Sequence, residues 1–202
     1  MGEPARQLED LYAQLVALPE GQVGEIYNGR LIANPRPAGG HALAYSVLGA
    51  DLLVPFQRGR GGPGGWWIID EPELHLIRDI EVLVPDIAGW RKERMPQLPR
   101  GHRFEVVPDW VCEILSPASQ RRDRAEKMAI YARHGVGWLW LLDPNYRTLE
   151  TYQLQDKHWL NLANYAGNDK VRAAPFDAIQ LELGDLWLEP EDPDNKDAED
   201  AE

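Results

Sequence analysis

The sequence has a single cysteine, no long apolar run and fewer basic than acidic residues, and each shortage excludes a class of protein. Cys112 is the only cysteine in 202 residues, so an internal disulfide is impossible, and its apolar neighbours predict a core position. Charges, glycine or proline interrupt every apolar stretch well before the ~20 residues that a membrane helix needs, and no basic-then-apolar signal segment begins the chain. We therefore expect a cytoplasmic protein without membrane contact.

The shortage of basic residues is concentrated at one end of the chain. The formal net charge is −12, from 21 Lys plus Arg against 33 Asp plus Glu, which argues against holding nucleic acid by bulk positive charge. Residues 189–202 contain eight acids and one lysine, a net −7, which leaves −5 for residues 1–188. We expect residues 1–188 to form one folded domain and residues 189–202 a disordered acidic tail.

The order of apolar patterns predicts an α/β (mixed α+β) fold. In chain order we expect a helix at 5–17, a hairpin at 24–35 around Asn28-Gly29, a helix at 41–56, and strands at 66–77 (with a break near Pro72), 82–90 and 109–115. A helix at 119–134, a strand at 138–142, a hairpin at 148–163 and an apolar segment at 179–188 follow. This order predicts one central mixed β-sheet flanked by helices, with an N-terminal β-hairpin and a C-terminal hairpin extension. The glycine-rich segment 59–65 has no Lys-Ser/Thr ending and leads into a strand, which favours a loop over a phosphate cradle.

Two acidic residues interrupt otherwise apolar strands. Asp86 follows Val84-Pro85, and Glu113 lies between Cys112 and Ile114. A buried carboxylate costs several kcal/mol unless it is paired or bound to a cation. On neighbouring strands, Asp86, Glu113 and a backbone carbonyl such as that of Ile114 would form an oxygen site suited to Mg²⁺ or Mn²⁺. Pairing with Arg91 or Arg103, or a solvated strand edge, is an equally supported alternative.

The helix after Glu113 carries an acid, a base and a phenol at helical spacing. Asp123, Lys127 and Tyr131 follow one another at i, i+4 and therefore share one helical face. Spacing alone favours a surface ion pair of Asp123 with Lys127 beside a tyrosine that anchors the helix to the sheet. The alternative is that this face points into a site.

These residues belong to an ordered set of motifs that resembles a known family. Pro85-Asp86 followed by Glu113 resembles the PD-(D/E)xK nuclease superfamily, and the longer set resembles its Uma-two branch (domain of unknown function eight-twenty, restriction-endonuclease-like). The matching stretches are 24–31, His41, 84–88, 113–119, Asp123 with Lys127 and Tyr131, 135–136 and 140–144. The resemblance spans about residues 8–188 and implies a single restriction-endonuclease-like domain.

One position departs from the superfamily motif. A lysine is expected two positions after Glu113, where strand alternation would put both side chains on one face, but Leu115 stands there. The resemblance implies that Lys127 supplies the missing ammonium, with Asp123 and Tyr131 as supporting residues. It also implies an extra acid from an early element. Strand parity favours Glu73 over Glu71 as a further metal ligand, on a strand beside that of Asp86, and Glu25 is a supporting candidate.

The sequence thus predicts a metal-dependent endonuclease that hydrolyses phosphodiester bonds of nucleic acid, with DNA as the expected substrate. Asp86, Glu113 and Lys127 are the expected catalytic residues, Mg²⁺ or Mn²⁺ the expected cofactor, and His41 either a substrate contact or, slightly favoured, a helix cap. Ten basic residues are candidates to line the cleft mouth: Arg58, Arg60, Arg91, Lys92, Arg94, Arg100, Arg103, Arg121, Arg122 and Arg124. The alternative is an inactive module with the same fold that acts through protein contacts, as a homodimer built on Trp138 and Trp159.

Overall fold

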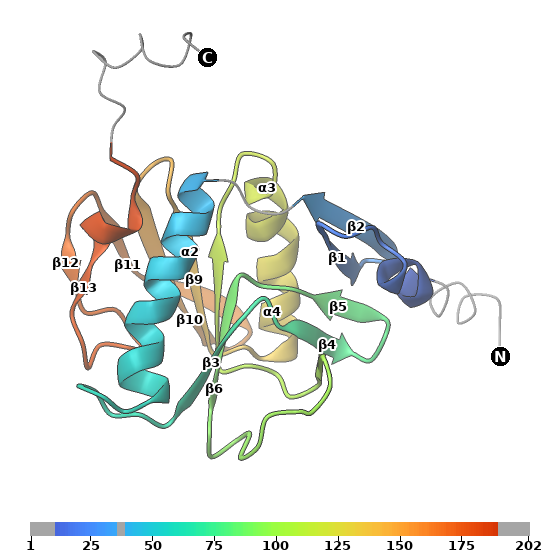
Figure 1. Ribbon diagram of the computed structural model, residues 1–202, viewed down its shortest axis with the longest axis horizontal. Helices are drawn as coiled ribbons and strands as arrows, with labels where there is room; N and C mark the ends of the chain where they lie inside the picture. The colour runs from blue at the N-terminus through green and yellow to red at the C-terminus, as the bar shows by residue number, and fades with distance from the viewer. Residues whose placement is uncertain (1–10, 36–38, 190–202) are drawn as a thin grey trace, which may run out of the picture.

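The protein is described in a computed structural model for residues 11–35 and 39–189, and two β-sheets form its framework (Figure 1). The first sheet contains, in spatial order, β2 (Arg30–Pro35), β1 (Gln22–Tyr27), β5 (Glu81–Leu83), β4 (Glu73–Ile77) and β7 (Arg103–Phe104). The second contains β11 (His158–Ala166), β10 (Thr148–Gln155), β9 (Trp138–Asp143), β8 (Trp110–Ile114), β6 (Ile87–Arg91) and β3 (Trp66–Asp70). Both are mixed, because β8 pairs with β9 and β4 with β7 in parallel.

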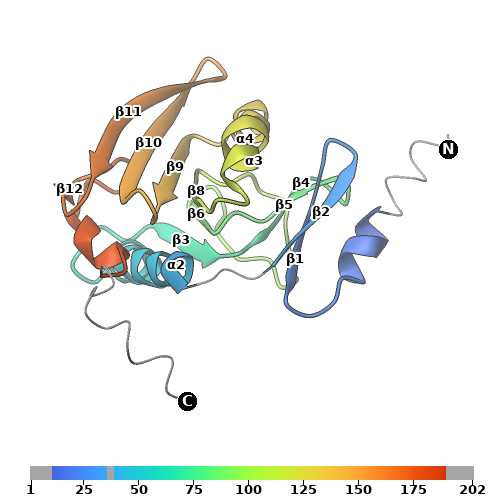
Figure 2. The same cartoon turned by 90° about the horizontal axis from the view of Figure 1, so that it is seen from above.

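Helices cover both faces of the larger sheet (Figure 2). One face packs against α2 (Gly39–Leu52), which continues as the π-helical turn η1 (Leu53–Gln57). The other packs against a helix made of α3 (Gln120–Arg122), the π-helical turn η2 (Asp123–Lys127) and α4 (Met128–His134). The pair β12 (Lys170–Val171) and β13 (Leu181–Glu182), with the 3₁₀ turn η3 (Leu183–Leu186), packs beside α2. The expected α/β architecture, with mixed sheet, flanking helices and two hairpins, is confirmed.

Strand alternation in β8 decides which helix each of its side chains meets. Trp110, Cys112 and Ile114 lie in the core beneath α2, whereas Val111 and Leu115 lie in the core beneath α4. Because side chains alternate between faces, Glu113 points to the α4 side. This parity brings the acid under the helix that carries Lys127. Cys112 is fully buried, as expected for a core residue.

The chain passes from the small sheet to the large one at Val84-Pro85-Asp86. The antiparallel register pairs Ile87 with Cys112, so its continuation would place Pro85 opposite Ile114. Proline has no N–H to donate to the ladder, and the Ile114 N–H donates to the Asp86 side chain, at 2.6 Å from Oδ2. The hydrogen-bond ladder between β6 and β8 therefore ends at Ile87, and Asp86 lies just before it, at the junction of the two sheets.

This junction corrects two expectations. The segment expected as one strand at 82–90 is divided between β5 and β6, in different sheets, so the core is not one central sheet. In the segment 66–77 the break expected near Pro72 is confirmed: β3 ends at Asp70, β4 begins at Glu73 in the other sheet, and Glu71 between them has a φ of 42°. The second half of this segment, β4, pairs with β5 and β7 and not with β6. The strand of Glu73 therefore lies beside the part of the expected strand 82–90 that precedes Asp86, and not beside the part that follows it.

The remaining elements agree with the patterns that predicted them. The first hairpin turns at Asn28-Gly29, both at positive φ, as a primed turn requires. The segment 59–65 is a loop, with no helix after it. Residues 11–16 are helical, whereas the start of the helix expected at 5–17 and nearly all of the expected tail lie outside the described residues. In the stretches 11–35 and 39–189, no helix is long and apolar enough to cross a membrane.

Candidate active site

A cavity of about 570 Å³ lies at the junction of the two sheets, between the start of α2 and the helix 120–134. Seven residues expected at the site line it: Glu25, His41, Asp86, Glu113, Ile114, Asp123 and Lys127. They come from β1, α2, the sheet junction, β8 and η2, which are up to about one hundred residues apart in the sequence. Tyr131 lies behind this wall and contacts Glu113. Of the residues expected to be catalytic, metal-binding or supporting, the structure thus brings all but Glu73 together.

Lys127 is the centre of the buried polar cluster. Its Nζ lies 2.8 Å from Glu113 Oε1, 2.9 Å from Glu25 Oε1 and 3.8 Å from Asp123 Oδ1, and only 4% of its side chain is exposed. The alternative of a surface pair with Asp123 therefore does not hold. Asp123 and Lys127 bound the π-helical turn η2, and such turns frequently occur at functional sites.

Glu113 has its carboxylate fixed by two donors. Its Oε1 accepts hydrogen bonds from Lys127 and from the Tyr131 hydroxyl, at 2.8 Å and 2.5 Å. Leu115, which occupies the position of the motif lysine, is buried in the core on the same face. An ammonium therefore reaches Glu113 from the helix, while the strand position serves packing.

Asp86 and Glu25 are each held by a backbone amide at the junction. Asp86 binds the Ile114 N–H through Oδ2 and contacts His41 Nε2 at 3.1 Å through Oδ1. Glu25 Oε1 accepts the Val84 N–H at 2.9 Å, and Oε2 lies 3.4 Å from Asn34 Nδ2. Backbone donors fix both carboxylates on the frame of the sheets. Asn34 was not anticipated, since no sequence pattern distinguishes it from an ordinary strand residue.

Of the two roles expected for His41, the structure contradicts that of a helix cap, whereas a substrate contact stays a prediction, because His41 lines the cavity. It is the third residue of α2, so it cannot cap the helix, and its ring is held by Asp86. Burial lowers the pKa of His41, but the hydrogen bond and charge of Asp86 and the nearby Ile114 carbonyl raise it by more. Asp86 therefore stabilises the protonated form of His41 in the cavity wall.

The cluster carries more negative than positive charge. Burial raises the pKa of Glu113 well above its usual range; Lys127 offsets part of this, while Asp123, Asp86 and Glu25 add to it. Burial also raises the pKa of Asp123. Burial would lower the pKa of Lys127, but the carboxylates around it, Glu113 first, hold it well above its usual value. One fixed ammonium and His41 face four carboxylates, so the site has a deficit of cationic charge.

This deficit and the chemistry of the donors fit a divalent cation. Nowhere in the described ranges are three His, Cys, Asp or Glu side chains grouped to hold a metal ion, so the candidate set consists of two carboxylates and a backbone carbonyl. The N–H and C=O of one strand residue point to the same side, so the Ile114 carbonyl faces Asp86 as its N–H does. Asp86, Glu113 and this carbonyl are the hard oxygen donors that Mg²⁺ and Mn²⁺ prefer.

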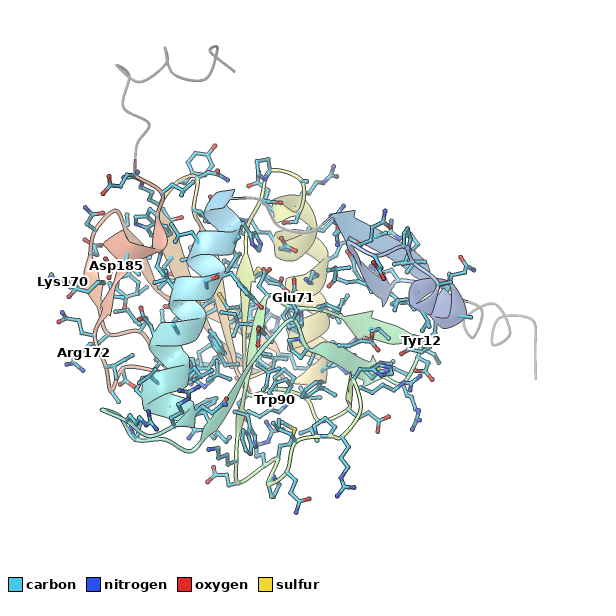
Figure 3. The ribbon with its side chains drawn as sticks, in the orientation of Figure 1. Tyr12, Glu71, Trp90, Lys170, Arg172 and Asp185 are labelled. Carbon is cyan, nitrogen blue, oxygen red and sulfur yellow. The ribbon has the colours of Figure 1, made fainter. Side chains whose placement is uncertain are left out.

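Glu73 is the expected ligand that the structure places elsewhere. Its Oε1 accepts a hydrogen bond from Tyr12 at 2.8 Å and lies 2.7 Å from His75 Nε2, in the small sheet. Figure 3 shows Tyr12 at the outer edge of the molecule, far from Glu71 at its centre. Glu71 lines the cavity, and its N–H binds the Asp86 carbonyl. Strand parity favoured Glu73 over Glu71, whereas the acid at the cavity is Glu71. The reason is that the chain turns between the two residues and β4 belongs to the other sheet.

Most of the basic residues expected at the cleft mouth are elsewhere. Of the ten, only Arg122 lines the cavity, and a second arginine that was not anticipated, Arg147, joins it from the turn between β9 and β10. Arg94, Arg103 and Arg124 are instead paired with acids: Asp109, Asp79 and Glu150. Arg147 has a φ of 52°, in the left-handed region, and an arginine in a sequence does not predict this conformation.

The two tryptophans considered for a dimer interface are packed within the chain. Trp138 packs against the core beneath α2. Trp159 packs against the core beneath α4, and its indole N–H donates to the Met128 carbonyl at 2.8 Å. Both side chains are half-buried, so neither forms a prominent exposed patch.

We expect Tyr131→Phe to lower the melting temperature (Tm) by about 5 °C, because the buried Glu113 loses a donor worth roughly 1–3 kcal/mol and Tm falls by about 2–4 °C per kcal/mol in a chain of this size. Differential scanning calorimetry measures the change. Tyr146→Phe is the matched control, because that side chain is 76% exposed. A Tm equal to that of the wild type would show that the contact between Tyr131 and Glu113 contributes nothing to stability.

Comparison with known proteins identifies the family. The family model Uma2, described as "Putative restriction endonuclease", matches residues 8–184. A crystal structure described as "a putative nuclease belonging to DUF820", from Anabaena variabilis, is similar with a TM-score of 0.66 and 25% identity, over 87% of this chain and 96% of that one. No curated protein matches the chain. Because the family model covers most of the chain, including the whole cavity cluster, the protein belongs to the Uma2 family of restriction-endonuclease-like proteins, as the sequence motifs indicated.

Proposed function

We propose that the protein is a metal-dependent endonuclease that hydrolyses phosphodiester bonds of DNA at this cavity. The observation that carries the proposal is the position of Lys127, whose ammonium lies 2.8 Å from the buried Glu113 in a cavity that also contains Asp86 and the Ile114 carbonyl. Family membership supports a nuclease role, and restriction-endonuclease-like proteins generally use divalent metals.

The proposed division of roles follows from the contacts of each residue. Asp86, Glu113 and the Ile114 carbonyl would hold Mg²⁺ or Mn²⁺; a divalent ion there lowers the pKa of a bound water and offsets charge on a phosphate. Tyr131 keeps Glu113 oriented, and the Ile114 N–H does the same for Asp86.

Lys127 is suited to act on the reacting atoms. Glu25 and Glu113 accept two of its three N–H groups, and the nearest further acceptor, Asp123, is 3.8 Å away. The third N–H can therefore hydrogen-bond the attacking water or a phosphate oxygen and stabilise negative charge as it develops. The raised pKa of Lys127 keeps this group protonated at neutral pH, which suits a donor and not a general base.

The metal part of the proposal predicts a pH-dependent thermal shift. In the metal-free protein the raised pKa values of Glu113 and Asp123 let the folded state retain protons that the unfolded chain has released. Their contribution to stability is therefore largest at low pH and falls as pH rises past the ordinary carboxyl pKa of about 4. A metal ion must displace these protons, so in assays at about pH 8 and about pH 5.5 we expect the rise in Tm caused by Mn²⁺ to be larger at the higher pH.

The control is Asp86→Ala, whose Tm is expected not to respond to Mn²⁺ at either pH. A shift of equal size in the variant would place the ion elsewhere on the protein. Hydrolysis itself is tested by Mn²⁺-dependent nicking of plasmid DNA and cleavage of single-stranded DNA, with EDTA as the metal-free control. Thermal shifts without cleavage of either DNA would show that the protein binds metal and would contradict the proposed hydrolysis.

A further inference from the structure

Two arginines line the cavity without a carboxylate partner. Arg122 donates to Asn34 Oδ1 at 2.6 Å and Arg147 to the Leu188 carbonyl at 2.8 Å, and in residues 11–35 and 39–189 neither is paired with a carboxylate. Of the twelve other arginines in these ranges, half form ion pairs: Arg30, Arg78, Arg94, Arg103, Arg124 and Arg133. Each cavity arginine thus keeps donors free, in the planar arrangement that matches the oxygens of a phosphate.

These arginines come from two different parts of the cavity wall. Arg122 precedes η2 on the helix above Glu113, and Arg147 lies in the turn between β9 and β10. A single phosphate at the carboxylates does not require two separate guanidinium groups in addition to Lys127. They are therefore placed to bind phosphates that flank the one being cleaved.

The cavity wall also offers apolar surface next to the acids. Val23, Val84, Pro117, Ala118, Pro144 and Leu188 all line the cavity. Sugar edges and phosphates use little apolar surface, whereas the faces of unpaired bases do. In a duplex these faces are stacked and paired, so only a single strand presents them.

The burial of the proposed reacting groups also favours a single strand over a duplex. The side chains of Glu113, Glu25 and Lys127 are each only 4% exposed and that of Asp86 is 15% exposed. A volume of about 570 Å³ is in the range of sites for a small ligand, so it holds a few nucleotides at most. A duplex is stiff over about 150 base pairs and cannot bend one strand into such a space without opening.

We propose that the cavity takes one unpaired DNA strand, with Arg122 and Arg147 binding the phosphates on either side of the scissile one. This inference deepens the proposed function and rests on it for the position of the scissile phosphate. It names the substrate class: single-stranded DNA, including the unpaired tails of duplexes, and not intact double helix.

Binding and cleavage are measured separately to test it. Fluorescence anisotropy in EDTA uses the Glu113→Gln variant, which we expect not to turn over, and three labelled probes: a single strand, its blunt duplex, and the duplex with a single-stranded tail. We expect the single strand and the tailed duplex to bind at least about tenfold more tightly than the blunt duplex.

The arginines are tested in the same background. Arg122→Gln and Arg147→Gln are each expected to weaken single-strand binding about tenfold and to reduce the salt dependence of log K by about 0.7 per lost phosphate contact. Arg121→Gln is the matched control, because Arg121 is exposed, adjacent in sequence and outside the cavity lining, and it leaves both values unchanged.

The outcomes separate this inference from the hydrolysis proposal. Equal or tighter binding of the blunt duplex, or an unchanged salt dependence in both cavity variants, overturns the inference. If the wild type cleaves the blunt duplex as fast as the single strand, the proposed hydrolysis is supported and the proposed preference for a single strand is wrong. Single-strand binding through both arginines without cleavage by the wild type retains the inference and removes the proposed function.

Discussion

Glu113→Gln is expected to reduce Mn²⁺-dependent DNA cleavage on the order of 10³-fold or more while the metal-free protein remains folded. The amide has the shape of the carboxylate and still accepts from Tyr131 and Lys127, so the buried contacts persist. It removes one of the two carboxylates proposed to hold the ion, and it lacks the negative charge that attracts a hard cation. Initial rates on a labelled oligonucleotide at saturating Mn²⁺ give the measurement.

Stability separates this chemical loss from a failure to fold. Burial already raises the pKa of Glu113, so a neutral side chain at this position costs the metal-free protein little. We therefore expect the metal-free Tm of Glu113→Gln to stay close to that of the wild type, while the Mn²⁺-induced rise disappears. Glu126→Gln is the matched control: this glutamate pairs with Arg30 outside the cavity lining, and cleavage is expected to be unchanged. Wild-type rates in Glu113→Gln would remove Glu113 from the catalytic residues.

The sequence indicated Asp86 and Glu113 because a carboxylate inside an apolar strand is costly unless a cation or a donor compensates its charge. Alternation alone determines that Glu113 shares a face with Val111 and Leu115. The same reasoning could not place Glu73. Whether Glu71 or Glu73 faces the cavity depends on a turn at Pro72, where Glu71 adopts positive φ and the chain enters another sheet. Pro72 itself predicts a break in the strand, but the sheet that the chain enters after the break is decided by tertiary packing, which residue spacing does not encode.

Lys127 shows a second limit of the sequence. Its spacing from Asp123 fits a surface ion pair as well as a buried site, and the helical face that carries both residues has no apolar signature. The outcome is decided by packing: Tyr131 and Ile130 anchor the helix on the core beneath α4, and this places η2 over Glu113 and Glu25. No sequence pattern predicted Arg147 at the cavity, because this residue lies in a turn, where neither helical nor strand periodicity applies.

Lys127→Met is expected to destabilise the protein by about 3–5 kcal/mol, because removing one partner of a buried ion pair leaves the others uncompensated. Glu113, Glu25 and Asp123 would then lie buried near one another without the ammonium that balances their negative charge. Guanidinium chloride unfolding of the metal-free variant at pH 7 measures the loss. Cleavage is expected to fall on the order of 10²-fold or more, since no other ammonium reaches Glu113 in the described part of the chain.

A second substitution distinguishes charge from packing as the cause. If uncompensated carboxylates destabilise Lys127→Met, then adding Glu25→Gln removes one of them and recovers part of the stability, whereas a packing defect would be unaffected or worsened. The sign of the pH dependence gives an independent check. Without the ammonium, the pKa values of Glu113 and Asp123 rise further, so the folded state binds more protons than the unfolded chain and the variant loses stability as pH rises from 5 to 8 relative to the wild type. A double variant no more stable than Lys127→Met, with the same pH profile as the wild type, would show that Lys127 serves packing and not charge balance at the site.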